Sequence, residues 1–523
     1  MASELLRFMG RPLAAVVVLG LFAGCGGQPE GGGVIPSSSG EPPPDPFLPP
    51  DPIDPPIDVP PTLTCDPDVS VSAAGRALVV RDPAVLSRFS LERVMTQLIE
   101  LAGATESPDV LLRRLFDAEN PAAQAVFPDV THCDDVDNAA FKNDPAVYCP
   151  RAEGALASSP GLFEPGHPDS FVPVAIVNRF DLTPQVGTTC GEYRIVFAKL
   201  SGRTDPANRV FLIFEAALPN PQGHDTLLGC RGMAEAWAAL EDEPTVEAVA
   251  DRLEQMFFAG LAPYRPIVHP DHYGAVSMDD DVYNVTHGQV RVSQQMQAPW
   301  EMREYHLEWA SPMNPLPPGS TPQELRFVPV TVKNNPLPEL FDRSNESEAA
   351  VAFRSEFIWN NLPDLSQSAF PKVRMRTGSK FNMGQSVVSG DATVDYASHA
   401  IGVAGADFAS EIQSTIELSN FGQDCPPDDP LTAASILHRA TSLTCAGCHA
   451  PQRFLGPERS LGCGLTFPST LGEVHIDENG TLSEALTDVF LPRRAEVMST
   501  YLQGCDLEAI MGSLEPPTGA IPK

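Results

Sequence analysis

The chain has 523 residues, too many for one hydrophobic core, so several domains are expected. Its formal net charge of −34 argues against nucleic-acid binding, because proteins that bind phosphates present a basic surface. The same charge argues against electrostatic docking on anionic lipid. Apolar residues make up 42% of the sequence, which is ample material for folded cores.

Residues 1–24 have the features of an export signal. Arg7 and Arg11 flank the start of an apolar run, "LAAVVVLGLFAG", that is shorter than the roughly 20 residues a membrane span needs. The run ends in "FAGC", which resembles a bacterial lipobox. The resemblance implies that Cys25 is lipidated, so that the membrane is a partner through a lipid anchor. Gly26 follows, where aspartate often marks inner-membrane retention, so we expect an envelope protein anchored to the outer membrane. The alternative is an ordinary secretory signal.

Residues 25–64 form a segment of different composition, rich in Gly, Pro, Ser and Asp. It includes "GEPPPDPFLPPDPIDPPIDVPP", which has too few large apolar residues to fold and favours an extended polyproline conformation. We therefore predict a disordered tether between the anchor and the folded part. A proline-rich ligand for a partner domain is the alternative interpretation.

Residues 65–424 are predicted to be a mixed α+β region of unknown function. Helices are expected within residues 89–118, where Ser90 and Ser107 are candidate N-caps and Pro108 would occupy a first helical position. Short segments rich in Val, Ile and Phe then predict strands: "FVPVAIVNRFDL", "EYRIVFAKL", "RVFLIFEAAL", "GQVRVSQQM", "WEMREYHLEWA" and "ELRFVPVTVK". An amphipathic helix, "EPTVEAVADRLEQMFFAGL", separates the first three from the others.

A cluster of imidazoles and carboxylates occurs in "HPDHYGAVSMDDDVYNVTH". Its members are His269, His272, Asp279, Asp280, Asp281 and His287. Residues of these types at this density are suited to a divalent metal, although acidic turns and surface histidines give the same pattern.

Residues 425–523 are predicted to be a small all-α domain. Two segments, "LTAASILHRATSL" and "LPRRAEVMSTYLQ", have helical apolar spacing, and the first leads into "TCAGCHA". Covalent haem attachment requires two thiols and an iron-binding histidine, and Cys445, Cys448 and His449 have the required spacing. A local disulfide or a thioredoxin-like redox pair would use the same two cysteines.

The last 95 or so residues resemble a class I c-type cytochrome domain in this motif and its flanking helices. The resemblance implies one covalent haem c, with thioethers at Cys445 and Cys448 and with His449 as proximal iron ligand. His475, in "GEVHIDENG", is a candidate distal ligand. Met498 lies on an apolar helical stripe and is predicted to be a core residue, Met511 is a further candidate, and an open sixth position is the remaining alternative.

Eight further cysteines predict up to four disulfides in an oxidising compartment. They are Cys65, Cys133, Cys149, Cys190, Cys230, Cys425, Cys463 and Cys505. A bond between Cys463 and Cys505 would close the C-terminal domain on itself. One upstream cysteine would then have to pair with Cys425 and tie the two domains together.

Three functional readings follow from these features. The whole chain resembles uncharacterised bacterial envelope lipoproteins, and the first reading is a c-type cytochrome lipoprotein that carries out one-electron transfer with an unknown redox partner protein. The second is a non-catalytic surface or binding lipoprotein in which Cys445 and Cys448 form a disulfide and no haem is bound. The third is an oxidoreductase whose α+β region passes electrons to the haem. Because no nucleophile elbow, P-loop or Rossmann fingerprint occurs, an electron carrier or binding protein is favoured over an enzyme.

Overall fold

The computed structural model describes residues 65–138, 140, 148–223, 226–274, 288–310, 324–388, 395–402, 407–454 and 460–514. The predicted export signal, Cys25 and the proline-rich segment therefore lie outside the described residues. The chain divides into two units, residues Met1–Pro55 and residues Pro56–Lys523, and only the second contains described residues. No described helix is both long and apolar enough to span a lipid bilayer.

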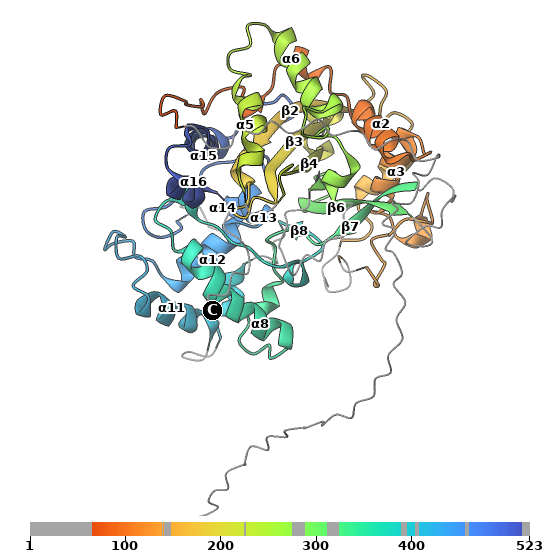
Figure 1. The fold of residues 1–523 in the computed structure, drawn as a ribbon. Coiled ribbons are helices and arrows are strands. Elements are labelled where there is room, and N and C mark those ends of the chain that lie inside the picture. Colours follow the sequence, from red (N-terminus) through yellow and green to blue (C-terminus); the bar gives the residue numbers. More distant parts are fainter. Residues whose placement is uncertain are drawn as a thin grey trace, which may run out of the picture. The chain divides into compact units, whose positions relative to one another are not determined.

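An antiparallel sheet, eight-stranded in the described part of the chain, forms the centre of the fold (Figure 1). Seven strands lie side by side in chain order, and a short eighth strand pairs with β6. The strands are β1 (Val79–Val80), β2 (Phe171–Arg179), β3 (Thr189–Lys199), β4 (Val210–Pro219), β5 (Gln289–Gln294), β6 (Glu301–Ala310), β7 (Glu324–Val330) and β8 (Ser386–Val387). The six predicted strand segments and the mixed α+β class are thus confirmed.

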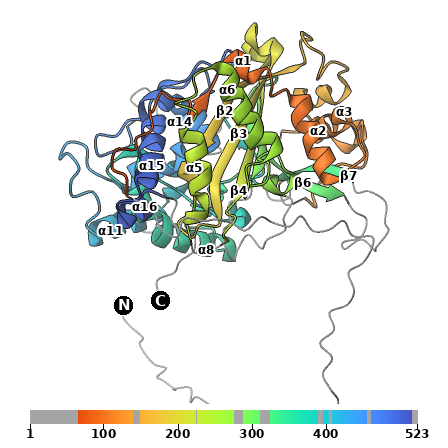
Figure 2. The same ribbon diagram turned by 45° about the horizontal axis from the view of Figure 1, so that its top comes forward.

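One face of the sheet is apolar and carries the larger core. Tyr193, Ile195 and Phe197 of β3 point into it together with side chains from four helices. These helices are α2 (Leu91–Ala102), α3 (Pro108–Asp117), α5 (Arg231–Ala238) and α6 (Val246–Glu254). Figure 2 shows α5 and α6 lying in front of the strands on this side. The predicted caps are confirmed, because the side chains of Ser90 and Ser107 accept backbone hydrogen bonds at the starts of α2 and α3.

A second core forms around a group of aromatic rings. The ring of Phe341 lies 4.8 Å from that of Phe353, 5.3 Å from that of Phe357 and 4.2 Å from that of Tyr396, centroid to centroid. Helices α8 (Glu348–Glu356), α9 (Leu362–Leu365), α11 (Phe408–Leu418) and α12 (Ala433–Ser442) pack around these rings. In Figure 1, α8, α11 and α12 gather below the sheet, away from α2 and α3.

The predicted small all-α domain of residues 425–523 is not confirmed, although its helices are present. Helix α12 packs into the second core through Ile436 and its neighbours. Helix α15 (Leu491–Gln503) packs into the core of the sheet through Met498 and Tyr501, and the Tyr501 hydroxyl donates a hydrogen bond to the Leu227 carbonyl at 2.5 Å. Helix α16 (Leu507–Ser513) follows it. The two amphipathic helices, α12 and α15, therefore bury their apolar faces in different cores and do not form a separate core with each other.

Among the described residues, four disulfides connect the eight cysteines that lie outside the Cys-x-x-Cys motif, as predicted. The pairs are Cys65–Cys505, Cys133–Cys149, Cys190–Cys230 and Cys425–Cys463. The predicted Cys463–Cys505 pair is wrong, and so is its consequence that an upstream cysteine reaches Cys425. The end of α15 lies beside the start of the described chain, where the Asp66 amide donates to the Gln503 carbonyl at 2.8 Å, and this brings Cys505 to Cys65.

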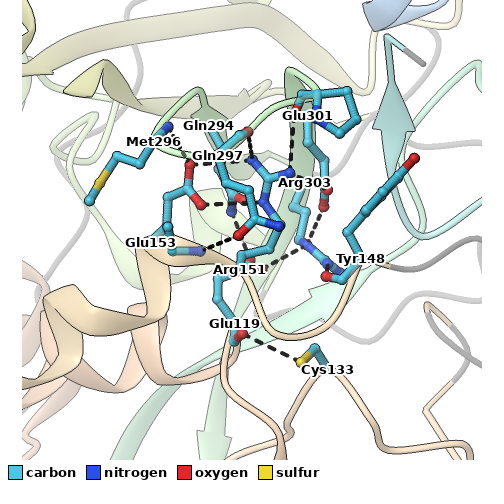
Figure 3. A network of polar contacts seen from close by, with 12 residues as sticks. Glu119, Cys133, Tyr148, Arg151, Glu153, Gln294, Met296, Gln297, Glu301 and Arg303 are labelled. Carbon is cyan, nitrogen blue, oxygen red and sulfur yellow. Dashed lines mark hydrogen bonds and ion pairs between the residues drawn. The ribbon is translucent and has the colours of Figure 1, made fainter. Parts of the chain in front are cut away.

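A buried ion network fastens the segment before β2 to the sheet (Figure 3). We call it the sealed network, and it consists of Glu119, Arg151, Glu153, Glu301 and Arg303, each at most 1% exposed at its side chain. Arg303 Nε lies 2.6 Å from Glu301 Oε1 and 3.1 Å from Glu119 Oε2. Arg151 Nε lies 3.3 Å from Glu153 Oε2. Three carboxylates thus face two guanidinium groups, and burial raises the pKa of Glu301 to about 7.

Candidate functional site

A cavity of about 970 Å³ lies between the second face of the sheet and the later part of the chain. Its floor consists of side chains of β2 to β7, and its walls come from residues 370–382, 442–449 and 467–494. Cys445, Cys448, His449 and His475 all line it. The structure therefore brings the predicted site residues together, in a cavity of which the α+β region forms the floor.

The cavity floor carries charged side chains that pair across neighbouring strands. The pairs in register are Arg179 with Glu192, Arg194 with Glu215, and Arg291 with Glu304. Arg194 Nη1 lies 2.9 Å from Glu215 Oε1, and Arg291 Nη2 lies 2.7 Å from Glu304 Oε1. These residues alternate along the strands with the apolar residues of the opposite face, so the period of two places all of them toward the cavity.

Positive charge exceeds negative charge around the cavity. Among the described lining residues, eight are Lys or Arg and four are Glu. The cations are Arg179, Arg194, Arg291, Lys333, Arg374, Arg376, Lys380 and Arg494, and the anions are Glu192, Glu215, Glu304 and Glu308. A local cationic surface in a chain of net charge −34 indicates that the cavity is electrostatically different from the rest of the protein.

The Cys-x-x-Cys motif forms a short helix, α13 (Cys445–His449), directly after α12. The side chain of Thr444 caps it by accepting a hydrogen bond from the Gly447 amide at 3.0 Å. A Cβ atom at Gly447 would lie 1.8 Å from the Thr441 carbonyl oxygen, so this position requires glycine where the chain turns back on α12. The resulting turn directs Cys445 and Cys448 to the cavity wall.

Both cysteines of the motif are free thiols, so the disulfide of the second reading is not formed. Burial raises the pKa of each thiol to about 12. The sulfur of Cys448 lies 3.2 Å from Nε2 of His475. Burial lowers the pKa of His475 well below its usual value. The pair is therefore a neutral thiol beside a neutral imidazole, and it lacks the thiolate that nucleophilic or redox catalysis needs.

His449 is held in place by three neighbours. Its Nδ1–H donates to the Glu473 carbonyl at 2.8 Å, so Nε2 is the unprotonated ring nitrogen. Its ring stacks on that of Trp300, with centroids 4.8 Å apart, and meets the ring of His475 edge to face, also at 4.8 Å. Burial lowers the pKa of His449 to about 4, so the imidazole is neutral at physiological pH.

This arrangement does not fit the predicted haem. Axial histidines must face each other across a porphyrin plane, whereas the rings of His449 and His475 are in direct edge contact. Nε2 of His475, which would have to bind the iron, is instead in hydrogen-bond contact with the Cys448 sulfur at 3.2 Å. No group of three or more His, Cys, Asp and Glu side chains in the described residues could hold a metal ion. The predicted function as a one-haem electron carrier is therefore wrong. The third reading, an oxidoreductase that passes electrons to the same haem, depends on that haem and is not supported either.

The other candidate ligands lie elsewhere. Met498 is fully buried in the core of the sheet and accepts a hydrogen bond from the Asn178 amide group at 3.5 Å, as expected for a core methionine. The rings of His269 and His272 lie 5.2 Å apart, centroid to centroid, with their planes inclined at 37°, and burial lowers the pKa of His272 to about 3. Asp279, Asp280, Asp281 and His287 lie outside the described residues.

Sequence reasoning missed the arginines of the cavity, above all Arg494. A signal for it exists in "LPRRAEVMSTYLQ", because Arg494 follows Leu491 by three residues and precedes Met498 by four. It therefore occupies a position on the apolar stripe of the helix, where arginine is uncommon unless it has a buried partner.

Comparison with known proteins adds no family. No protein-family model matches the chain, and neither the curated proteins nor the solved structures contain a significant match. The function is therefore argued from the site itself.

Proposed function

We propose that this chain is a non-catalytic binding protein that holds one small organic molecule in the cavity. The observation that carries the proposal is the cavity, whose volume of about 970 Å³ is at the upper end of the range for small-molecule sites, roughly 300–1,000 Å³. Its lining combines apolar side chains such as Phe467, Val474 and Phe490 with fixed polar groups. This combination is typical of ligand sites, in which apolar area gives affinity and a few polar groups give orientation.

Protonation states support binding over catalysis. Cys445 and Cys448 carry thiols with raised pKa, and His449 and His475 carry imidazoles with lowered pKa. General acid–base catalysis works best with groups that titrate near the operating pH, and none of these four does so. A wall of neutral side chains instead offers hydrogen bonds and polarisable sulfur to a ligand.

The cavity walls are tied to the sheet, which favours a preformed site. Arg209 Nε lies 2.6 Å from Glu478 Oε1, and Arg209 Nη2 lies 3.1 Å from Glu478 Oε2. Arg209 Nη1 also donates to the Gly472 carbonyl at 2.8 Å. This bidentate contact holds the segment around His475 against the strands, so little ordering entropy is lost when a ligand binds.

The proposal is tested by filling the cavity. Ile213 is only partly buried although β4 is an inner strand, because its side chain faces the cavity. Ile213→Trp should occupy that space and lower the affinity for the amphipathic dye anilinonaphthalene sulfonate by about tenfold, measured by fluorescence titration. Val351→Trp is the matched control, because Val351 is 51% exposed on α8 and its replacement leaves the cavity unchanged.

Two outcomes would contradict the proposal. One is a dye titration in which the wild type does not bind the dye, or binds it with the same affinity as Ile213→Trp does. The other is a chromophore attached covalently at Cys445 and Cys448 when the chain is produced in a host that attaches haem to exported proteins, seen by mass spectrometry of the denatured protein.

A further inference from the structure

Three arginines from distant parts of the chain meet at one end of the cavity. We call them the arginine corner: Arg179 at the end of β2, Arg194 on β3 and Arg494 on α15. Arg179 binds Asp181 through two contacts, Nε to Oδ1 at 2.9 Å and Nη2 to Oδ2 at 3.0 Å. Both oxygens of the Asp181 carboxylate therefore already accept a hydrogen bond from Arg179.

Arg494 lacks a matched partner within the described residues. Its Nε lies 3.8 Å from Asp181 Oδ1, which is beyond hydrogen-bond distance, and its side chain is only 10% exposed. Burial, and then the nearby charge of Arg179, hold the pKa of Arg494 well below its usual value. Arg194 does not add to this excess, because its guanidinium group lies 2.7 Å from Glu192 Oε2 and 2.9 Å from Glu215 Oε1. With two guanidinium groups sharing Asp181, the corner carries about one uncompensated positive charge.

Two other buried arginines, Arg439 and Arg354, have several hydrogen-bond acceptors each. Arg439 is 0% exposed and donates to the carbonyls of four residues, Leu365, Gln367, Leu461 and Gly462. Arg354 is 3% exposed and donates to three carbonyls. An unmatched buried guanidinium is costly, so Arg494 differs from these two in needing an acceptor that the described chain does not supply.

An apolar surface continues from Arg494 into the π-helical segment Ala485–Phe490, which leads directly into α15. Leu486 and Phe490 precede Arg494 at intervals of four residues, so the three side chains share one face, and all three line the cavity. The ring of Phe490 lies 6.1 Å from that of Phe370, which in turn meets Phe467 at 5.0 Å. A charged end and an apolar wall are therefore adjacent in one cavity.

We infer that the arginine corner binds the single carboxylate of an amphipathic ligand, whose apolar body lies along Leu486 and Phe490. This inference rests on the proposed function, because it names the class of molecule that the cavity takes. A carboxylate is planar and accepts two parallel hydrogen bonds from a guanidinium group. One negative charge also matches the local excess of one positive charge, whereas a cationic ligand would add to it.

The experiment compares two probes that differ only in the head group. Dodecanoate and dodecanol displace anilinonaphthalene sulfonate from the wild type and from Arg494→Gln, and the inhibition constants are compared. Dodecanoate should bind the wild type about tenfold more tightly than dodecanol, because a hydrogen bond to a charged group supplies that much. Arg494→Gln should lose this preference while its affinity for dodecanol stays within about twofold.

Two further variants control for folding and charge. Arg493→Gln alters the neighbouring residue on α15, which does not line the cavity and bonds to Glu496 and the Ser513 carbonyl, so the preference for dodecanoate should persist. Arg494→Lys keeps the charge and should retain part of the preference. Equal binding of dodecanoate and dodecanol by the wild type would overturn the inference and leave the proposed function standing. Failure of both probes to displace the dye would overturn the inference, and failure of the dye itself to bind would remove the proposed function.

Discussion

The sealed network and the arginine corner both bury unequal numbers of charges, and they resolve the imbalance in different ways. The sealed network has one carboxylate too many and lies away from the cavity, and Glu301 takes up the difference with a pKa raised to about 7. The arginine corner has one guanidinium too many, and an arginine does not readily give up its proton. It opens on a cavity, so an anion from solution can supply the missing charge. Unequal numbers of buried charges that are closed off from solvent thus indicate a structural role. Unequal numbers of charges that face a cavity indicate a site for a charged ligand.

The largest expected effect comes from breaking the sealed network. Arg303→Met would leave Glu119, Glu153 and Glu301 with Arg151 alone, and an uncompensated buried charge should lower the free energy of unfolding by about 3–5 kcal/mol. Urea denaturation measures this change. Arg88→Met is the control, because Arg88 pairs with Asp251 and Glu254 at the surface, where solvent screens the ion pairs, and its loss should change the free energy of unfolding much less. Similar losses in the two variants would contradict a special role for the network.

A smaller effect is expected from pH. Because the pKa of Glu301 is raised from 4.5 to about 7 by folding, its stabilising contribution is complete below pH 4.5 and is lost as the pH rises through 7. The wild type should therefore lose about 3 kcal/mol of stability from this group on going from acid to alkaline solution.

Glu301→Gln tests this directly by urea titrations at pH 5 and pH 8. The glutamine cannot ionise, so the difference between the two pH values should shrink in the variant. Glu92→Gln, on the exposed side of α2, should leave the pH dependence of the wild type unchanged. A pH profile that is identical in the wild type and Glu301→Gln would show that another group neutralises the sealed network.

The smallest expected effect has the opposite sign and sharpens the contrast. Arg494→Met removes a buried, unmatched charge from the arginine corner while keeping an unbranched chain, so the free energy of unfolding should rise by about 1 kcal/mol in the absence of ligand. Arg493→Met should not raise it, because that residue loses an ion pair with Glu496. If Arg494→Met destabilised the protein as Arg303→Met is expected to, the corner would be structural and the comparison would fail.

The sheet and its helices were predictable because short-range chemistry determines them. Ser90 and Ser107 cap helices whether or not the rest of the fold is known, and strands rich in Val, Ile and Phe bury side chains in any sheet. In the same way, "LPRRAEVMSTYLQ" predicts the bounds of α15. What these patterns determine is the type of element and its buried face.

They do not determine which core receives that face. The amphipathic helices α12 and α15 looked like parts of one small domain, yet Ile436 and Met498 lie in different cores. The predicted disulfide pairing was wrong for the same reason. Eight cysteines allow about a hundred pairings, and only the tertiary fold brings Cys65 to Cys505. The motif residues and His475 do share one cavity, but the arginine corner depends on β2, β3 and α15 meeting, which no local pattern records.

The Cys65–Cys505 bond joins the beginning of the described fold to the end of α15, 440 residues apart. The chain between these cysteines is therefore a covalent ring that contains the sheet and every residue placed around the cavity. A protease that cuts this ring once opens it without releasing a fragment, since each new end remains joined through the disulfide. For a protein expected to work outside the cytoplasm, this topology keeps the strands of the cavity floor and the helix that carries Arg494 on one molecule after a first cleavage.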